Sequence, residues 1–519
     1  MTKREFLQSV GINAGAAAMY RSMTALGMMG ASTVHGNTLD LPVGSGRGKR
    51  VAILGAGIGG LVAAYELSKA GYTCTVLEAT ARAGGRNFTA RAGDVIYEED
   101  SQQWVNFGYE AHLYANLGPA RIPHHHRAIL GYCREFGVEL EVFTNDNRAA
   151  LFHHQDHFEG QPVTARRVMT DARGYIAELL AKAVGGNSLD AELTSEDKEL
   201  LLDMLRGYGG LDADDLYTGS GRGGYLGEYL HRGLGLPADV HAPLGLSALL
   251  QSGFLDYRLR FSQSLNQNPT LFQPVGGMDA IVDAFKQRVG HLIQYRSPVE
   301  EIRQTEGGAQ ITYSRDGRPA EALDVDFAIC TIPASVLKDI TNNFSSETQT
   351  AIESVVFVPA VKIAFQTWRR FWEEDQAIYG GISWTDQDIT QIWYPAAGYH
   401  RNDGVILGAY IWSHTPGLRY TDLSPYERAQ AAIEEGEHLH PGYANEIAAW
   451  VSRAWAKVPF QKGGWAEEYS VSERLRSPEG AIYFAGEQLS ALTGWQEGAV
   501  LATYAAVEAI SERVIAEGA

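Results

Sequence analysis

The stretch VAILGAGIGG, residues 51–60, decides how the N-terminal part of this 519-residue chain folds. Residues 51–54 form a short apolar run that suits a buried parallel strand. Glycines 55, 57 and 60 follow in G-x-G-x-x-G spacing, and LVAAYELSKAG, residues 61–71, predicts a helix. In this motif the first glycine permits a tight turn, the second lets the backbone approach a pyrophosphate, and the third lets helix and strand pack closely. The pattern therefore predicts a dinucleotide held at the N-terminus of the helix.

A second strand strengthens this prediction. TCTVLE, residues 73–78, ends on an acid 23 residues after Gly55. An acid there accepts hydrogen bonds from ribose hydroxyls and repels a 2′-phosphate, so NAD or FAD is favoured over NADP. The next turn, EATARAGGRNF, carries Arg82 and Arg86, which we expect to contact the phosphates or the ring system.

Composition limits the classes of partner. Apolar residues make up 45% of the chain and charged residues 20%, which describes a globular protein of two or three domains. The formal net charge of −19 argues against nucleic acid or an anionic membrane surface as a partner. No stretch has the roughly 18 consecutive apolar residues that would span a bilayer, so stable membrane insertion is not expected.

The first 32 residues leave two interpretations open. TKREFL resembles a twin-arginine export signal with lysine in the first arginine position, which would indicate a periplasmic or secreted protein. Arg21 interrupts the apolar region that follows, and no A-x-A cleavage site is evident. An uncleaved amphipathic helix, and with it a cytoplasmic location, is slightly favoured.

Cysteine and histidine do not indicate a metal site. Cys74, Cys133 and Cys330 lie far apart without a C-x-x-C pair, so we expect them to be buried apolar residues. Histidines occur in the clusters HHH, residues 124–126, and HHQDH, residues 153–157. Because a contiguous triplet cannot converge on one ion, we expect surface or channel-entrance histidines and no bound metal.

Alternating patterns along the chain predict an α/β fold with a discontinuous nucleotide domain. Residues 165–184 and 195–210 have helical periodicity, with Ser195 and Asp197 as candidate caps of the second helix. Strand-like runs within residues 271–335 are expected to join the first sheet, and residues 356–475 predict an antiparallel sheet with helices. The expected units are a Rossmann-like domain that binds the dinucleotide, NAD or FAD (48–103, 263–355 and 476–519), a mixed α+β substrate-binding domain (104–158 and 356–475) and a helical lobe (159–262).

At this point the sequence resembles the flavin-containing amine oxidase family, and within it the L-amino acid oxidases. The shared motifs are the glycine turn ending in Glu78, ARAGGR, GGMD at 276–279, a lysine shortly after a strand-opening proline, and YFAGE at 483–487. The resemblance implies FAD as cofactor. The cofactor-binding residues that it implies are Gly55, Gly57, Gly59, Gly60, Glu78, Ala79, Arg82, Gly84, Gly85, Arg86, Gly118, Pro119, Ala120, Arg121, Val299, Gly486, Glu487 and Trp495.

Narrower features point to the amino acid oxidases. YANLGPARIPHHHR, residues 114–127, resembles the pattern in which an arginine after Gly-Pro-x clamps the substrate carboxylate, and that arginine is Arg121. A guanidinium suits this role because it can hold a carboxylate bidentately. Tyr410 in GAYIW resembles the tyrosine that hydrogen-bonds the same carboxylate. In LTGW the resemblance assigns the Gly494 carbonyl to the substrate amine and the Trp495 ring to the reacting carbon.

Two departures from relatives change the expectation. Monoamine oxidases bind flavin covalently through a cysteine, but KGGWAEE places Trp465 there, so non-covalent FAD is expected. Snake-venom enzymes carry a histidine, proposed as a base, where this chain has Gln267, so a histidine base is not expected. Trp412 and Trp465 replace smaller residues and predict broad or aromatic-leaning specificity, with a basic side chain held by cation–π contact as the alternative.

The reaction implied is oxidative deamination of an L-amino acid by hydride transfer from Cα to flavin N5. It yields a 2-oxo acid, ammonia and, with dioxygen, hydrogen peroxide. Lys362 is the expected catalytic residue: it would hold a water near the flavin, with a pKa lowered by an apolar pocket. Three alternatives stay open: an amino acid 2-monooxygenase, a monoamine or polyamine oxidase, and a non-catalytic binding protein of the same fold. The family resemblance also suggests a homodimer.

Overall fold

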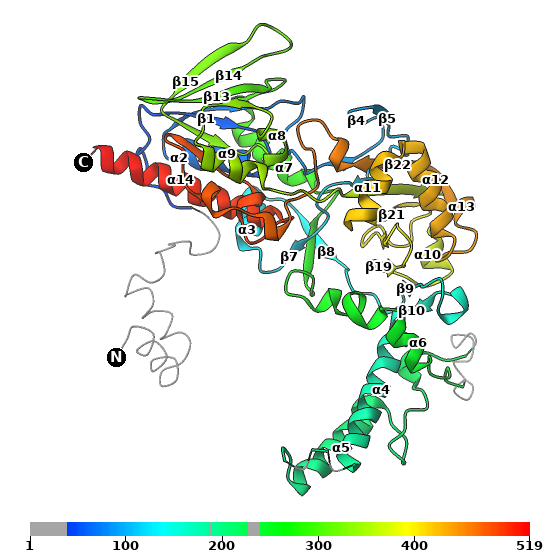
Figure 1. Ribbon diagram of the computed structural model, residues 1–519. Coiled ribbons are helices and arrows are strands. Elements are labelled where there is room, and N and C mark those ends of the chain that lie inside the picture. The colour runs from blue at the N-terminus through cyan, green and yellow to red at the C-terminus, as the bar shows by residue number, and fades with distance from the viewer. Residues whose placement is uncertain (1–38, 187, 190, 227–238, 519) are drawn as a thin grey trace, which may run out of the picture.

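The computed structural model describes residues 39–186, 188–189, 191–226 and 239–518, so the export-signal question lies outside the described residues (Figure 1). The chain has a mixed α/β fold built around a parallel sheet that is consistent with a Rossmann-like nucleotide domain. The strands of this sheet, in spatial order, are β12 (Ile293–Gln294), β2 (Thr73–Leu77), β1 (Arg50–Leu54), β16 (Phe327–Cys330) and β23 (Ile482–Phe484). Every neighbouring pair in it is parallel.

The central strand β1 shows why the sheet is a middle layer. Residues 51–54 are buried, and alternate side chains of a strand point to opposite faces. Val51 and Ile53 pack among helices, whereas Ala52 and Leu54 pack toward a second sheet. The helices are α2 (Ile58–Lys69), α3 (Arg127–Phe136), α7 (Asp279–Val289) and α14 (Gln496–Gly518). The second sheet contains, in order, β15 (Glu321–Val325), β14 (Gly308–Tyr313), β13 (Val299–Thr305) and β17 (Thr341–Asn342), with α8 (Ala334–Leu337) and α9 (Ser346–Glu353) nearby.

Two strand-like segments do not join the first sheet as expected. Residues 299–305 form β13, which pairs with β14, and residues 271–274 form β11, which lies between two strands of a separate small sheet. That sheet contains β7 (Ile122–Pro123), β11 (Leu271–Pro274) and β8 (Leu140–Phe143). An apolar pattern shows that a strand is buried but does not show which sheet buries it. The edge of the parallel sheet is instead β12, which is only two residues long and gives no periodic signal.

Residues 356–475 contribute five of the seven strands of a large sheet. Its strands, in order, are β10 (Val163–Thr164), β9 (Leu151–Phe152), β19 (Gly381–Trp384), β20 (Gln391–Tyr394), β21 (Gly404–Ile411), β18 (Val361–Thr367) and β22 (Ile447–Ala454). The pairs are antiparallel except β9 with β19. Its accompanying helices are α10 (Phe371–Glu374), α11 (His414–Asp422), α12 (Pro425–Gly436) and α13 (Tyr443–Glu446).

Helices α4 (Ala165–Gly185) and α5 (Ser195–Gly209) lie side by side and project from the body as an arm (Figure 1). The predicted cap Ser195 is wrong by one residue, because Thr194 caps α5 and forms a capping box with Asp197. A threonine before a serine makes both residues plausible caps, and only the backbone turn selects one. The other described elements are β3 (Thr89–Ala90), β4 (Val95–Glu98), β5 (Ser101–Trp104), β6 (Ala115–Asn116) and α6 (Leu246–Gln251).

The three cysteines are buried and unpaired, as the sequence predicts. Burial raises the pKa of each thiol to about 12, so they stay protonated at neutral pH. Within the part of the chain that the structure describes, no helix combines the length and the apolar character needed to cross a bilayer.

Candidate active site

A cavity of about 460 Å³ lies where the two glycine-rich turns meet the C-terminal segment. Of the residues singled out in the sequence, its walls include Gly55, Gly57, Gly59, Glu78, Ala79, Gly84, Gly85, Arg86, Gly118, Pro119, Val299, Lys362, Tyr410, Trp465, Gly486, Glu487, Gly494 and Trp495. Gly60, Arg82, Ala120, Arg121 and Trp412 are not among its lining residues. Segments that are separated by more than 400 positions along the chain thus form one wall.

Each of the three positions in the first turn is occupied by glycine for a different structural reason. Gly55 has φ +105°, a left-handed conformation that favours glycine, and a Cβ on it would lie 2.7 Å from Thr331 Oγ1. A Cβ on Gly60 would lie 1.9 Å from the Gly55 carbonyl oxygen, so helix α2 could not pack on β1. A Cβ on Gly57 would meet no atom within 4 Å. This open position lies beside the cavity at the N-terminus of α2, where backbone N–H groups attract an anion.

Glu78 links the ends of the first two strands. Its Oε2 accepts a hydrogen bond from the Ala56 N–H at 2.8 Å, and its Oε1 accepts from Thr80 N–H and Oγ1 at 2.9 and 2.7 Å. The side chain is 6% exposed and lies on the cavity wall. An anionic acceptor is therefore fixed at the edge of the nucleotide turn.

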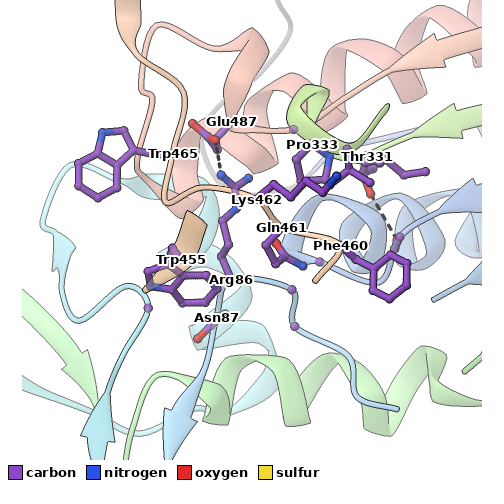
Figure 2. Close-up of a pocket in the computed structure, with 18 of the residues that line it drawn as sticks. Arg86, Asn87, Thr331, Pro333, Trp455, Phe460, Gln461, Lys462, Trp465 and Glu487 are labelled. Atoms are coloured by element: carbon purple, nitrogen blue, oxygen red, sulfur yellow. Dashed lines mark hydrogen bonds and ion pairs between the residues drawn. The ribbon is translucent and has the colours of Figure 1, made fainter. Parts of the chain in front are cut away.

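An ion pair joins the second glycine turn to the C-terminal segment. Arg86 Nη1 lies 2.6 Å from Glu487 Oε1 and donates to the Gly464 carbonyl at 3.0 Å (Figure 2). Glu487 also accepts from the N–H groups of Ala466 and Gly494 at 3.3 and 3.0 Å. This pair therefore positions three separate stretches of the cavity wall.

Arg82, which the sequence predicts to contact the phosphates or the ring system, bonds the backbone of its own turn and is not among the residues that line the cavity. Its Nη1 donates to the carbonyls of Ala83 and Asn87 at 3.1 and 3.2 Å, and it also bonds the Gly85 carbonyl. Its guanidinium lies 4.7 Å from the Phe88 ring centre. The side chain supports the turn from behind, and a direct contact with a ligand stays a prediction.

Several cavity residues escaped the sequence analysis. Asn87 and Gln496 each have a side-chain amide whose nitrogen and oxygen are buried without a hydrogen-bond partner, and both line the cavity. Buried polar groups are normally satisfied, so these two amides indicate a polar ligand. Asn87 directly follows ARAGGR and Gln496 directly follows LTGW, so proximity to those motifs was the available signal. Thr331, Trp455, Phe460, Gln461 and Lys462 also line the cavity, without any motif to mark them (Figure 2).

Lys362 lies on β18 and lines the cavity. It is 4% exposed, and its Nζ donates to the carbonyls of Gly118 at 2.6 Å and Asn116 at 3.3 Å. Its Nζ also lies 4.5 Å from the Tyr410 ring centre. Burial lowers the pKa of Lys362 to about 7, with the positive charge of Arg121 as a second cause. A group with this pKa exchanges protons at physiological pH.

Arg121 lies next to this lysine, against aromatic rings. Its guanidinium carbon is 4.5 Å from the Trp393 ring centre and 5.5 Å from that of Trp495. Its Nε and Nη2 donate to Gln267 Oε1 at 2.9 and 2.6 Å. Trp393 and the neighbouring Ala120 line a second cavity of about 100 Å³. Trp393 is therefore shared between the Arg121 environment and that smaller space.

Trp465 lies on the cavity wall beside Tyr410 and Gly494. The Trp465 and Tyr410 ring centres are 6.4 Å apart, and a Cβ on Gly494 would lie 3.3 Å from the Trp465 ring. Gly494 has φ +79°, so this close approach also requires glycine. Trp412 packs at the edge of two apolar clusters behind the wall. Trp465 thus faces the cavity, as expected, and Trp412 does not line it.

The expectation of surface or entrance histidines is wrong for two of them. His126 and His153 are 1% and 0% exposed. His126 packs edge-on against Trp495, with 5.1 Å between ring centres, and His153 Nδ1 lies 2.9 Å from Thr385 Oγ1. Histidine is amphipathic enough to be buried when one ring nitrogen has a partner, which composition does not reveal. Among the residues that the structure describes, no group of three or more His, Cys, Asp or Glu side chains has an arrangement that could hold a metal ion.

Comparison with known proteins identifies the family. Residues 58–511 match the flavin containing amine oxidoreductase family, and the chain belongs to it. It is therefore a flavin-dependent oxidoreductase of the type that acts on a carbon bearing an amino group. The chain is 28% identical to the flavin-dependent L-tryptophan oxidase RebO of Lentzea aerocolonigenes, over 89% of this chain and 98% of that protein. It is 26% identical to an L-amino-acid oxidase of Bothrops pauloensis, over 87% of each chain.

Solved structures share the fold at lower identity. Putrescine oxidase bound to putrescine superposes with a TM-score of 0.57 at 18% identity, covering 90% of this chain and 99% of that one. Cyclohexylamine oxidase from Brevibacterium oxydans gives a TM-score of 0.59 at 17% identity with the same coverage. At this identity the likeness establishes the fold alone.

The cavity fits the flavin cofactor that the family implies. The open Cβ position at Gly57, the fixed carboxylate of Glu78 and the unpartnered amides of Asn87 and Gln496 offer a phosphate cradle, a ribose acceptor and polar contacts. The glycine turns and the C-terminal segment would hold FAD between them.

Proposed function

We propose that the protein is an L-amino acid oxidase that binds FAD without a covalent bond. The observation that carries this proposal is the position of Arg121, a fixed positive charge that acts on the buried Lys362 and packs on Trp495 of the cavity wall. An oxidase of simple amines needs no cation at this place, whereas an amino acid presents a carboxylate to it. The amino acid oxidases among the relatives support the same substrate class.

The chain's own residues bind and orient the substrate. Arg121 and Tyr410 would hold the carboxylate, and the Gly494 carbonyl would accept a hydrogen bond from the substrate amine. A backbone acceptor suits this amine because it does not hold the positive charge that the amine must lose before Cα is oxidised. Held between the glycine turns and the C-terminal segment, FAD would supply the hydride-accepting chemistry and the route by which the electron pair reaches dioxygen. Trp495 and Trp465 exclude water and fix the orientation of Cα.

Lys362 is the candidate for proton handling. Its Nζ is anchored by two carbonyls of the 116–118 segment, so its position is fixed while its charge can change. With a pKa of about 7 it can hold a water molecule in either protonation state and return a proton at neutral pH.

The aromatic wall supports a preference for aromatic L-amino acids. Trp393 packs against both Arg121 and Tyr410, Trp495 packs against Arg121, and Trp465 packs against Tyr410. Indole rings stack on aromatic substrates and also attract cationic ones. A relative named for L-tryptophan oxidation agrees with the first of these. We further propose that 48–103, 263–355 and 476–519 form the cofactor unit, with the other segments forming the substrate unit and a helical lobe.

The test is a peroxide-coupled assay of the purified holoenzyme against L-amino acids, their D-enantiomers and the corresponding amines. Peroxide from L-amino acids alone, with 2-oxo acid as product, supports the proposal. Amide as the product would instead favour a 2-monooxygenase. Peroxide from amines alone would mean that Arg121 does not bind substrate.

A further inference from the structure

We infer that Gln267 is a specificity-determining residue that occupies the carboxylate position on Arg121 and is displaced by the substrate carboxylate. This inference rests on the proposed function. It starts from the two hydrogen bonds that Arg121 Nε and Nη2 donate to the single oxygen Oε1 of Gln267. Nε–H and Nη2–H form an edge of the guanidinium that can hold a carboxylate with one N–H to each oxygen, and here both donate to the single amide oxygen.

Hydrogen bonds from the surrounding turn hold the backbone of Gln267 in place. The Gln267 N–H donates to the Ser264 carbonyl at 2.9 Å, and its carbonyl accepts from Asn145 Nδ2 at 2.8 Å. The preceding Asn266 Oδ1 accepts from Nε2 of His125 and His126 at 2.9 and 3.2 Å. The backbone is therefore anchored on both sides, and the Gln267 side chain can rotate away without rearranging the turn.

The buried histidine connects this turn to the cavity wall. Burial lowers the pKa of His126 to about 4, so the ring is neutral at physiological pH and adds no charge beside Arg121. The same ring packs edge-on against Trp495, on which Arg121 also packs. The turn, the guanidinium and the tryptophan thus form one connected unit.

Displacement has a clear energetic direction. The amide oxygen of Gln267 is neutral, whereas a carboxylate adds the Coulomb attraction of a full negative charge and offers one oxygen to each N–H of the guanidinium. A substrate carboxylate therefore replaces Gln267, whereas a neutral ligand does not. When no substrate is present, Gln267 accepts two hydrogen bonds from the guanidinium at this position. Gln267 consequently weakens the binding of any ligand at Arg121, and a negatively charged ligand is the kind that can overcome this competition.

The test compares two ligands of the holoenzyme, benzoate and its neutral isostere benzamide, by perturbation of the flavin absorbance. Gln267→Ala removes the competing oxygen, so the Kd of benzoate should fall about threefold or more, and that of benzamide should fall at least as much because a neutral ligand can then also reach Arg121. Gln267→Glu places a permanent carboxylate on Arg121, so the Kd of benzoate should rise at least about tenfold. Gln263→Ala, at an exposed glutamine in the short helix that precedes the turn, is the matched control and should change neither.

Steady-state kinetics give a second readout. In Gln267→Ala the KM for the amino acid should fall while kcat is kept, because only competition for Arg121 is removed. Weaker benzoate binding in Gln267→Ala would mean that Gln267 orients Arg121 and is not displaced, which overturns the inference. Unchanged benzoate binding in Gln267→Glu would overturn it as well.

Failure of the inference is separable from failure of the proposed function. If Arg121→Met abolishes benzoate binding but the Gln267 variants behave like wild type, only the inference fails. If Arg121→Met binds benzoate normally, the carboxylate site itself is wrong.

Discussion

The nucleotide turns and the substrate wall of the same cavity are built in opposite ways. The turns use glycines and backbone groups within a short stretch, where a side chain on Gly55 or Gly60 would clash with the protein and one on Gly57 would enter the open space beside the cavity. The substrate region depends on contacts between distant segments: Lys362 on the wall bonds a carbonyl 244 positions away, and Arg121 beside the wall bonds a glutamine 146 positions away. A site made of local backbone tolerates almost no substitution, whereas one made of distant side chains can be altered in specificity one residue at a time.

The largest expected effect separates two glycines of the same turn. Gly60→Val should destabilise the protein by more than about 4 kcal/mol, because its side chain meets the Gly55 carbonyl oxygen within the helix–strand contact. Gly57→Val should keep the fold but lose flavin, because its side chain points into open space beside the cavity. Melting temperature of the flavin-free protein and flavin content per chain distinguish them. Equal loss of stability in both variants would contradict the different roles of these glycines.

Glu487→Gln tests the ion pair that joins the two regions. The substitution keeps the shape but leaves Arg86 without its charged partner, and removing one member of a buried pair costs about 3–5 kcal/mol. Since Arg86 is 22% exposed, we expect the lower end of that range or less. Chemical denaturation measures the loss, and Asp339→Asn, at the exposed pair with Lys462, is the control. A loss no larger than that of the control would show that the pair does not position the wall.

Lys362→Met should change the pH dependence of stability. Because the folded-state pKa of Lys362 is lowered to about 7, the unfolded chain binds more protons between pH 7 and about 10.5. The wild type therefore gains stability as pH rises through this window, by up to about 1.4 kcal/mol per pH unit. The advantage of the variant should be greatest at or below pH 7 and should shrink toward pH 10. The hydrogen bonds lost to two carbonyls lower its stability at every pH, so only the slope is diagnostic.

Melting curves of both proteins from pH 6 to 10 provide the measurement, with the exposed Lys338→Met as control. Parallel curves for wild type and Lys362→Met would show that Lys362 titrates normally. Activity of the variant, measured over the same range, should lose the ionisation near pH 7.

The last prediction concerns whether the flavin is attached covalently. Acid precipitation of the holoenzyme should release all the flavin into the supernatant, because Trp465 offers no nucleophile to it. Absorbance of the supernatant and of the redissolved pellet measures the distribution. Yellow colour retained by the pellet would show a covalent bond elsewhere.

The difference between the nucleotide turns and the substrate region also explains which parts of the fold and of the site the sequence predicts. The glycine turn, Glu78 and the parallel strands follow from short motifs and local sterics, and the structure places them on one cavity. The contact between Arg121 and Gln267 could not be predicted, because no local pattern links the 114–127 stretch to the 264–268 turn. Asn87 and Gln496 carry no chemical signature, and only the lack of partners in the folded state makes them notable. The sequence correctly predicts a strand at β13 but assigns it to the wrong sheet, because an apolar pattern does not specify which strand lies next to it.

The most direct test of the central claim is anaerobic reduction of the flavin by a matched pair, L-tryptophan and tryptamine, which differ only in the carboxylate. We predict that L-tryptophan reduces the wild-type holoenzyme at least about 100-fold faster at limiting concentration, since losing one partner of a buried charge pair costs about 2–5 kcal/mol. Arg121→Met should abolish this difference by slowing the amino acid alone. Equal reduction of the wild type by both compounds, or an unchanged preference in Arg121→Met, would contradict the assignment of Arg121 as the carboxylate-binding residue.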